Sequence, residues 1–139
     1  MAKFKPIVEA FNFPDPVLLK VPIYDGAHVE FEAIKKAIRE LPETGVITEF
    51  MRDALQEHLG SSKIYQEGDG YSEAITMAGY ITDPNGRTVP AAMVARSINV
   101  GTNLRAPTRF ISKAVAASRK PAEEAMRKSA DEIFRKAGN

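Results

Sequence analysis

Seven basic residues and no acidic residue lie between Asp83 and Glu123. They are Arg87, Arg96, Arg105, Arg109, Lys113, Arg119 and Lys120. Such a block can contact nucleic-acid phosphates, an acidic partner, or the acidic part of an identical subunit. A second interpretation stays open, in which the block is a solvated surface whose balancing acids come from elsewhere in the fold. Only one aromatic residue, Phe110, lies within the block, so base stacking on single strands is not expected.

The rest of the chain offers few residues for catalysis. Cysteine is absent, which excludes disulfides, thiolate metal sites and a cysteine nucleophile. Neither His28 nor His58 has a second histidine at helical metal-binding spacing. No phosphate-binding glycine loop, nucleophile elbow or paired-carboxylate motif occurs. The acidic turn 67–70 could bind a cation at Asp69 only with ligands from elsewhere. We therefore expect no enzyme, no cofactor and no metal, and a small enzyme or cation module around Asp69 is the weakest alternative.

The segment 98–117 connects the elements that must position the basic block. Gly101 and Thr102 end an alternating apolar stretch, and glycine is free to adopt positive φ. Pro107 then favours an extended approach to an Ala-rich helix that starts around Phe110. We expect a strand, a turn and a helix start here, with Gly101, Thr102, Pro107 and Phe110 as the structural residues of this connection.

A long β-hairpin is expected before this connection. A short strand at Ile64 and Tyr65 is followed by a strand over 71–81, which alternates imperfectly. The stretch 84–86, Pro-Asn-Gly, is typical of a hairpin turn. Residues 89–100 are expected to return as the partner strand.

Helices are expected on both sides of this hairpin. Apolar residues recur at three- and four-residue spacing over 29–41, after a turn at Asp25-Gly26, and again over 46–59, where Thr44 is available as an N-cap. Helical spacing also occurs over 108–117, and a last helix over 122–137 would hold Pro121 in its first turn. The predicted fold class is α+β, a small curved antiparallel sheet with a long hairpin, packed by N-terminal and C-terminal helices.

Residues 1–25 form a proline-rich, apolar segment that we expect to be an extended arm, preceding a single domain over 26–139. The arm either packs on its own domain or ties neighbouring subunits together. Its inter-subunit candidates are the apolar residues Phe11, Phe13, Leu18, Leu19 and Ile23. No signal segment or membrane span is evident, and the chain is expected to be cytosolic and soluble. The LPETG at 41–45 matches a sortase signal, but without a secretory signal before it or an apolar span after it we interpret this as coincidence.

The two halves of the chain carry opposite charge. Residues 1–60 hold seven Lys/Arg against ten Asp/Glu, whereas residues 61–139 hold twelve against eight. Halves of opposite sign can form a head-to-tail contact between identical subunits, and such contacts close into rings.

The order of these motifs resembles that of the neck and tail-completion proteins of tailed bacteriophages, which include tail terminators and head-tail joining proteins. The resemblance rests on the helix at 31–41, Thr44-Gly45, the hairpin 72–100, Gly101-Thr102, and Ala106-Pro107 followed by Phe110-Ile111 and Ala114. It covers about 110 residues. The chain departs from the family pattern in the helix expected at 46–59, in the residues 97–100 before Gly-Thr, and in its extra arm.

The resemblance implies a structural virion protein of the neck, assembled in the host cytoplasm. It would form a hexameric or dodecameric homo-oligomeric ring that joins the head connector to the tail tube, next to connector and tube or sheath proteins. Genomic DNA would pass through the lumen, and no membrane is involved. Arg87, Arg96, Arg105, Arg109 and Lys113 are then candidates for the lumen or the subunit seam. The alternative is a small, non-specific DNA-binding protein that uses the basic block 87–120.

Overall fold

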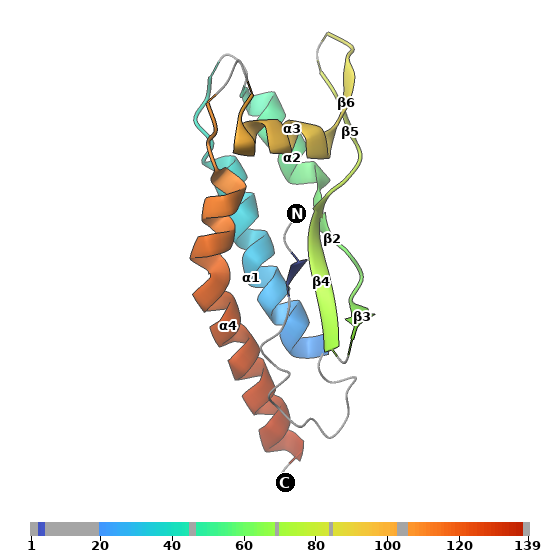
Figure 1. The fold of residues 1–139 in the computed structure, drawn as a ribbon, viewed down its shortest axis with the longest axis vertical. Coiled ribbons are helices and arrows are strands. Elements are labelled where there is room, and N and C mark those ends of the chain that lie inside the picture. The colour runs from blue at the N-terminus through green and yellow to red at the C-terminus, as the bar shows by residue number, and fades with distance from the viewer. Residues whose placement is uncertain are drawn as a thin grey trace.

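The computed structural model describes residues 3–4, 20–44, 47–68, 70–83, 85–102 and 106–137. The molecule is elongated, with two long helices along one side, a small sheet along the other, and two short helices across one end (Figure 1). The architecture is α+β with N-terminal and C-terminal helices, as the sequence predicts. We call the end that carries the short helices the head.

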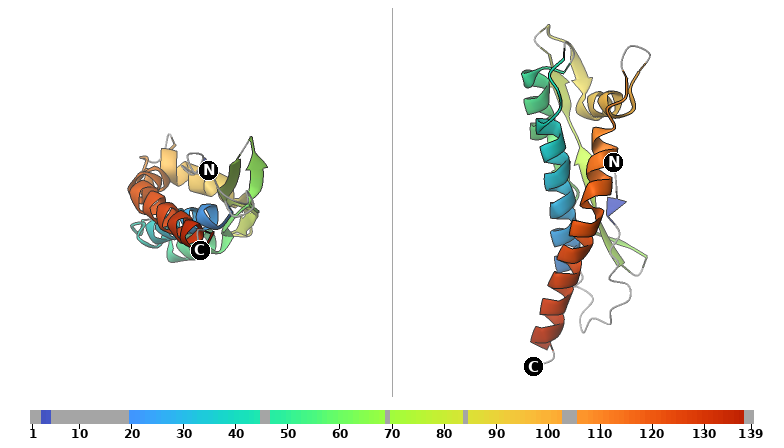
Figure 2. Two further views of the ribbon diagram at one scale, coloured as in Figure 1. Left: turned by 90° about the horizontal axis from the view of Figure 1, so that it is seen from below. Right: turned by 90° about the vertical axis from the view of Figure 1, so that its left-hand side faces the viewer.

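Two antiparallel helices, α1 (Lys20–Arg39) and α4 (Phe110–Ala137), form the long axis of the molecule. They lie side by side in both perpendicular views (Figures 1 and 2). The buried stripe of α1 includes Ile23, Ile34 and Ile38. The facing stripe of α4 is made of small residues with one methionine, namely Ala114, Ser118, Ala122, Met126, Ser129 and Ala130. Small side chains let two helix backbones approach closely, which explains the long α1–α4 contact.

The sheet is organised around its longest strand, β4 (Gly70–Met77). On one edge β4 pairs with β1 (Lys3–Phe4), and on the other with β2 (Leu59–Ser61) and β3 (Tyr65–Glu67), all antiparallel. The first residues of the expected arm therefore add a strand to the sheet of their own chain.

A second, two-stranded sheet is formed by β5 (Tyr80–Thr82) and β6 (Thr88–Pro90) at the head. Its turn lies where Pro-Asn-Gly predicts it, and Gly86 has a φ of 83°. The Asp83 carboxylate accepts hydrogen bonds from the backbone N–H groups of Asn85 and Arg87, both at 2.9 Å. This is the local capping that aspartate provides in turns.

The expected strand over 89–100 is wrong beyond Pro90, because residues 91–100 form helix α3 (Ala91–Val100). The apolar residues of this segment fit both the two-residue period of a strand and the 3.6-residue period of a helix. The residues that are buried, Ala91, Ala95 and Ile98, follow the helical period. Pro90 has no N–H and precedes the first helical turn as its N-cap. The connection at Gly101 therefore joins two helices rather than a strand and a helix.

The first helix begins earlier than expected, so Asp25-Gly26 is helical and not a turn. Pro22 lies in the first turn, where a proline costs no intrahelical hydrogen bond. Burial of Ile23 and Ala27 offsets the low helix propensity of Gly26.

The two expected C-terminal helices are one continuous helix, α4, that passes through Pro121. Helix α2 (Glu49–His58) is shorter than predicted at its start, and its N-cap is Thr48 rather than Thr44. The Thr48 hydroxyl accepts from the Met51 N–H at 3.2 Å, whereas the Thr44 hydroxyl accepts from the Ile47 N–H at 3.0 Å.

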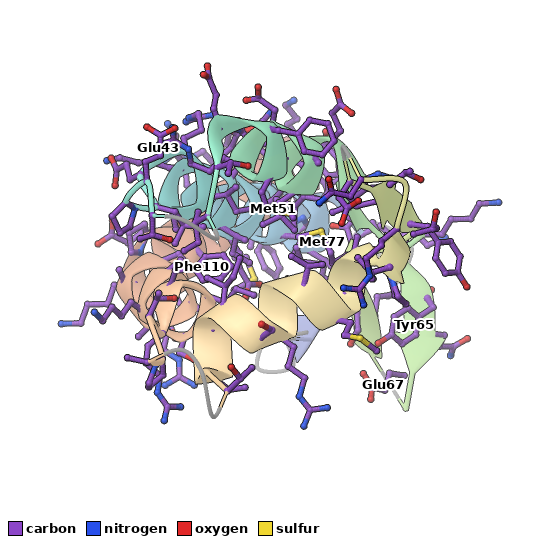
Figure 3. The ribbon with its side chains drawn as sticks, turned by 90° about the horizontal axis from the view of Figure 1, so that it is seen from above. Glu43, Met51, Tyr65, Glu67, Met77 and Phe110 are labelled. Carbon is purple, nitrogen blue, oxygen red and sulfur yellow. The ribbon has the colours of Figure 1, made fainter. Side chains whose placement is uncertain are left out.

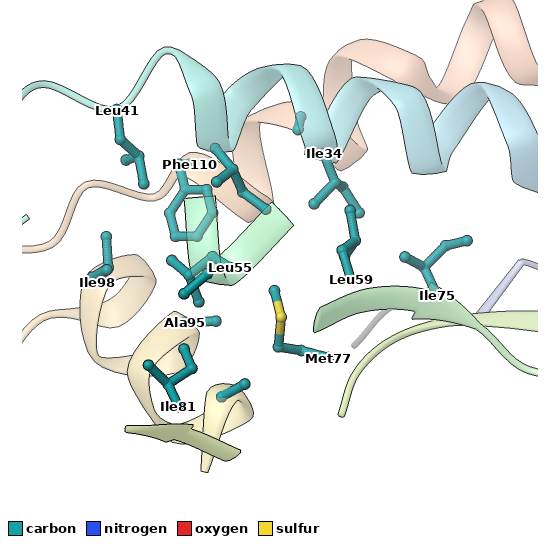
Figure 4. Close-up of a cluster of buried hydrophobic side chains, with 14 of the residues drawn as sticks. Ile34, Leu41, Leu55, Leu59, Ile75, Met77, Ile81, Ala95, Ile98 and Phe110 are labelled. Carbon is teal, nitrogen blue, oxygen red and sulfur yellow. The ribbon is translucent and has the colours of Figure 1, made fainter. Parts of the chain in front are cut away.

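The hydrophobic core lies at the head, where every major element contributes to it (Figure 4). Ile34 and Ile38 of α1 meet Leu55 of α2, Met77 of β4 and Phe110 of α4 there. Ala95 and Ile98 close this core from the α3 side. One buried cluster therefore joins all of these elements at the head, which makes it a rigid support for surface residues.

Candidate functional site

Four residues of the basic block lie on three elements that share the head of the molecule. Arg87 lies at the β5–β6 turn, Arg96 on α3, and Arg109 and Lys113 at the start of α4. All four side chains are exposed. Within the described part of the chain none of them makes an ion pair or a side-chain hydrogen bond. Arg105 lies outside the described residues. The structure therefore gathers four of the five candidate basic residues at one end, with their charges unpaired.

Helix α3 presents Arg96 because its opposite side is buried. Ala91 and Ala95 are 0% and 1% exposed, so the helix is anchored along this side. The Ala91 N–H also donates to the carbonyl of Gly79 at 2.9 Å, which ties the start of α3 to the residue just before β5. Arg96 is held outward by this packing.

The α3–α4 connection, residues 101–109, is held by hydrogen bonds to the last turn of α3. Gly101 has a φ of 80°, and its N–H donates to the Ser97 carbonyl at 2.9 Å. The Thr108 hydroxyl donates to the Ile98 carbonyl at 2.7 Å, and the Arg109 N–H donates to the Asn99 carbonyl at 2.9 Å. These bonds satisfy carbonyls that have no partner at a helix C-terminus. They also fix where α4 begins.

Asn99, in the last turn of α3, holds the start of α4 in a way that the sequence did not reveal. Its side-chain oxygen accepts from the Ile111 and Ser112 N–H groups, at 3.0 and 3.3 Å. It therefore caps α4 from twelve residues away, whereas sequence patterns identify caps only next to the helix they close. The asparagine itself, a preferred capping residue type, is the one available sign.

The four predicted structural residues of the connection differ in what they do. Gly101 supplies the positive φ, and Phe110 is buried in the core at 6% exposure. Thr102 and Pro107 are exposed. Arg109 has a φ of 57°, an uncommon conformation for a residue other than glycine, and it directly precedes α4.

The predicted inter-subunit residues of the arm are largely not described. Phe11, Phe13, Leu18 and Leu19 lie outside the described residues. Ile23 is 0% exposed inside α1, so it packs on its own chain and is not available to a neighbour.

Two buried carboxyl groups lie away from the head. Burial raises the pKa of Glu30 in α1, which is 3% exposed. Burial also raises the pKa of Glu73 in β4, opposed by a hydrogen bond from Ser61 and by the nearby imidazole of His28. Tyr24 stacks on His28 with ring centroids 6.2 Å apart, and these residues line a cavity of about 140 Å³.

This Glu73 cluster does not have the order of groups that activates a nucleophile. The Ser61 hydroxyl is hydrogen-bonded to the Glu73 carboxyl group itself. A serine nucleophile would instead need its hydroxyl hydrogen-bonded to an imidazole, and that imidazole hydrogen-bonded to a carboxylate.

Among the described residues no group of three or more His, Asp or Glu side chains is arranged to hold a metal ion. Over those same residues, no helix combines the length and apolar character that crossing a bilayer requires.

Comparisons with known proteins give no assignment: no family model, no curated protein and no solved structure matches this chain.

Proposed function

We propose that this chain is a structural ring protein of a tailed-bacteriophage neck, which joins the head connector to the tail tube. The observation that carries the proposal is the head of the molecule, where Arg87, Arg96, Arg109 and Lys113 are exposed and unpaired. A ring that guides DNA needs a positive surface on a rigid support, and it needs no base-reading or catalytic groups.

Two further features support this role. The resemblance at 31–41, 44–45, 101–102 and 106–114 is to neck and tail-completion proteins. The α+β architecture, with long N-terminal and C-terminal helices beside a small sheet, suits a subunit that packs against neighbours on two sides. In this role the protein is part of the virion, and its partners are further copies of itself, the connector, the tube or sheath proteins, and the DNA in the lumen.

The mass of the purified particle tests the proposal. Native mass spectrometry or light scattering would be performed at low and high protein concentration, with and without isolated phage tails. Rings of six or twelve copies, or subunits that bind tail ends in a fixed stoichiometry, are the expected result. A stable monomer or dimer that ignores tails would overturn the neck assignment.

A second function, non-specific DNA binding, is favoured by the same exposed arginines. A protein of this kind would bind duplex DNA as a monomer or dimer, and its affinity would fall steeply with salt because phosphate contacts release counterions. Titration of duplex DNA at two salt concentrations therefore separates the two functions. Tight, salt-dependent binding by a monomer would identify the basic block 87–120 as the functional site.

A further inference from the structure

Helix α3 carries a mixed apolar and basic surface that is exposed in the described part of the chain. Met93, Arg96 and Val100 are spaced by three and four residues, so they share one side of the helix. Met93 is 62% exposed and Val100 is 45% exposed. They lie opposite the buried residues Ala91, Ala95 and Ile98. We call Met93, Arg96 and Val100 the α3 face.

Helix α2 carries a surface with the same spacing and the opposite charge. Phe50, Asp53 and Glu57 repeat the separation of three and four residues, and Phe50 is 46% exposed. Asp53 and Glu57 are also exposed, while Ala54 and Leu55 face the core. We call Phe50, Asp53 and Glu57 the α2 face.

The two faces point away from each other at the head of the molecule. Seen from above, α2 and α3 lie on opposite sides, with Met51, Met77 and Phe110 between them (Figure 3). Within the described part of the chain, Asp53, Glu57 and Arg96 make no ion pair. Each face therefore combines a large exposed apolar side chain with an unpaired charge that the other face complements.

We propose that the α3 face of one copy docks on the α2 face of the next copy, with Arg96 against Asp53 and Glu57. Met93 and Val100 would then cover Phe50, which removes three of the largest exposed apolar side chains from water. Because the two faces differ and lie on opposite sides of the molecule, the contact is heterologous. Each added copy leaves one face free for the next, until the rotation between successive copies closes a ring. The inference rests on the ring proposed above; it assigns Arg96 to the subunit seam and leaves Arg87, Arg109 and Lys113 as the candidates for the lumen.

Exchange of the charges tests this contact in the full-length protein. Arg96→Glu, or Asp53→Lys combined with Glu57→Lys, should each weaken self-association by about tenfold or more, because like charges then meet across the seam. The triple variant that carries both changes should recover most of the wild-type association. Arg119→Glu and Glu132→Lys are matched controls on the exposed surface of α4, and neither should alter association. Sedimentation equilibrium measures the effect, and circular dichroism confirms that each variant is folded.

Cysteine cross-linking tests the same contact by geometry, because the chain has no cysteine of its own. Phe50→Cys and Met93→Cys proteins would be mixed and oxidised at high concentration, alone and on isolated tails. A disulfide between the two different variants is the expected product, and the double variant should form a ladder that ends at the ring size. Cross-links only between identical variants would indicate a two-fold contact and overturn the proposal, as would no cross-link under either condition.

The outcomes for the contact and for the neck role are distinguishable. Rings that form on tails but ignore both the charge changes and the cysteines would overturn the α2–α3 contact and leave the neck role standing. Conversely, charge-dependent self-association that neither closes into rings of six or twelve copies nor binds to tails would support the contact and overturn the neck role. If both charge reversals weaken association but the triple variant does not recover it, the charged residues do not meet each other across the seam, and the α2–α3 contact is overturned.

Discussion

Glu30 is a carboxyl group buried where the fold offers it little compensation. It is 3% exposed, and its Oε2 atom has no hydrogen-bond partner among the described residues. Burial raises its pKa above the ordinary value of 4.5, so the folded protein holds the proton at pH values where the unfolded chain has lost it. Glu30 therefore lowers the free energy of unfolding by an amount that grows as the pH rises from about 4.5 to the raised pKa, and that stays constant at higher pH.

We expect Glu30→Met to stabilise the protein at pH 7 by about 1–3 kcal/mol, since it removes an unsatisfied buried group and keeps a side chain of similar length. The gain should shrink at pH 4, where the carboxyl group is mostly protonated in both the folded and the unfolded state. Thermal unfolding at the two pH values measures this, with the exposed Glu32→Met as the control. An equal gain at both pH values would show that ionisation is not the cause.

Asn99 links the end of α3 to the start of α4. Its side-chain oxygen accepts hydrogen bonds from the Ile111 and Ser112 N–H groups. Its side-chain nitrogen lies 3.4 Å from the Ser112 hydroxyl oxygen, which is a long contact. We expect Asn99→Ala to lower the free energy of unfolding by about 1 kcal/mol, as loss of a helix cap does. Ser112→Ala, which removes only the long contact, should change stability little. Urea unfolding of both variants decides this, and equal losses would place the stabilisation in the Ser112 contact instead.

At the scale of elements, α4 is unusual in passing through a proline. Pro121 is exposed and lies well inside the helix, where it cannot donate a hydrogen bond to the carbonyl of Ala117. Pro121 also borders an open, largely apolar groove of about 510 Å³ between α1 and the first turns of α4. The helix continues because its buried residues on both sides of Pro121, Ser118 and Ala122, pack along α1.

We expect Pro121→Ala to stabilise the protein by about 1–3 kcal/mol, because it restores a helical hydrogen bond and removes a steric conflict. Pro42→Ala, in the exposed link between α1 and α2, is the control and should be neutral or slightly destabilising, since it only loosens the unfolded chain. Differential scanning calorimetry measures both. A loss of stability in Pro121→Ala would mean that the proline shapes α4 to follow α1.

At the scale of the whole molecule, opposite charges are separated across the head. The exposed acids Glu49, Asp53 and Glu57 lie on α2, and the exposed bases Arg96, Arg109 and Lys113 lie on α3 and the start of α4. The net charge is only +1, so bulk charge alone gives little repulsion between copies. The separation of the acidic residues on α2 from the basic residues on α3 and α4 makes one side of each copy attract the opposite side of the next.

Self-association should therefore weaken with salt. Raising the salt from about 0.1 M to 1 M shortens the Debye length from about 10 Å to about 3 Å, which screens exposed charge pairs. Sedimentation velocity across this range should show a shift toward smaller species in the wild type, and a smaller shift in Arg96→Glu. Association that strengthens with salt would indicate that apolar contacts such as those of Met93 and Phe50 dominate the seam.

Local patterns in the sequence determined much of this protein. The helical spacing of apolar residues around Ile34 and Ile38, and again around Leu55, specified two amphipathic helices. Pro-Asn-Gly specified the β5–β6 turn, and helices and turn together specified the α+β class. The acid-free basic block is also a property of sequence alone. These features could be predicted because each depends on residues within one or two turns of one another.

Tertiary structure decided the rest, because it depended on contacts between distant residues. Residues 91–100 fit a strand or a helix, and the core that receives Ala95 and Ile98 selected the helix. Packing on α1 carried α4 through Pro121, and Asn99 reached across the connection to cap it. Only the folded chain brings the β5–β6 turn, α3 and the start of α4 to one end, with Arg87, Arg96 and Lys113 on them, and puts α2 and α3 on opposite sides of that end.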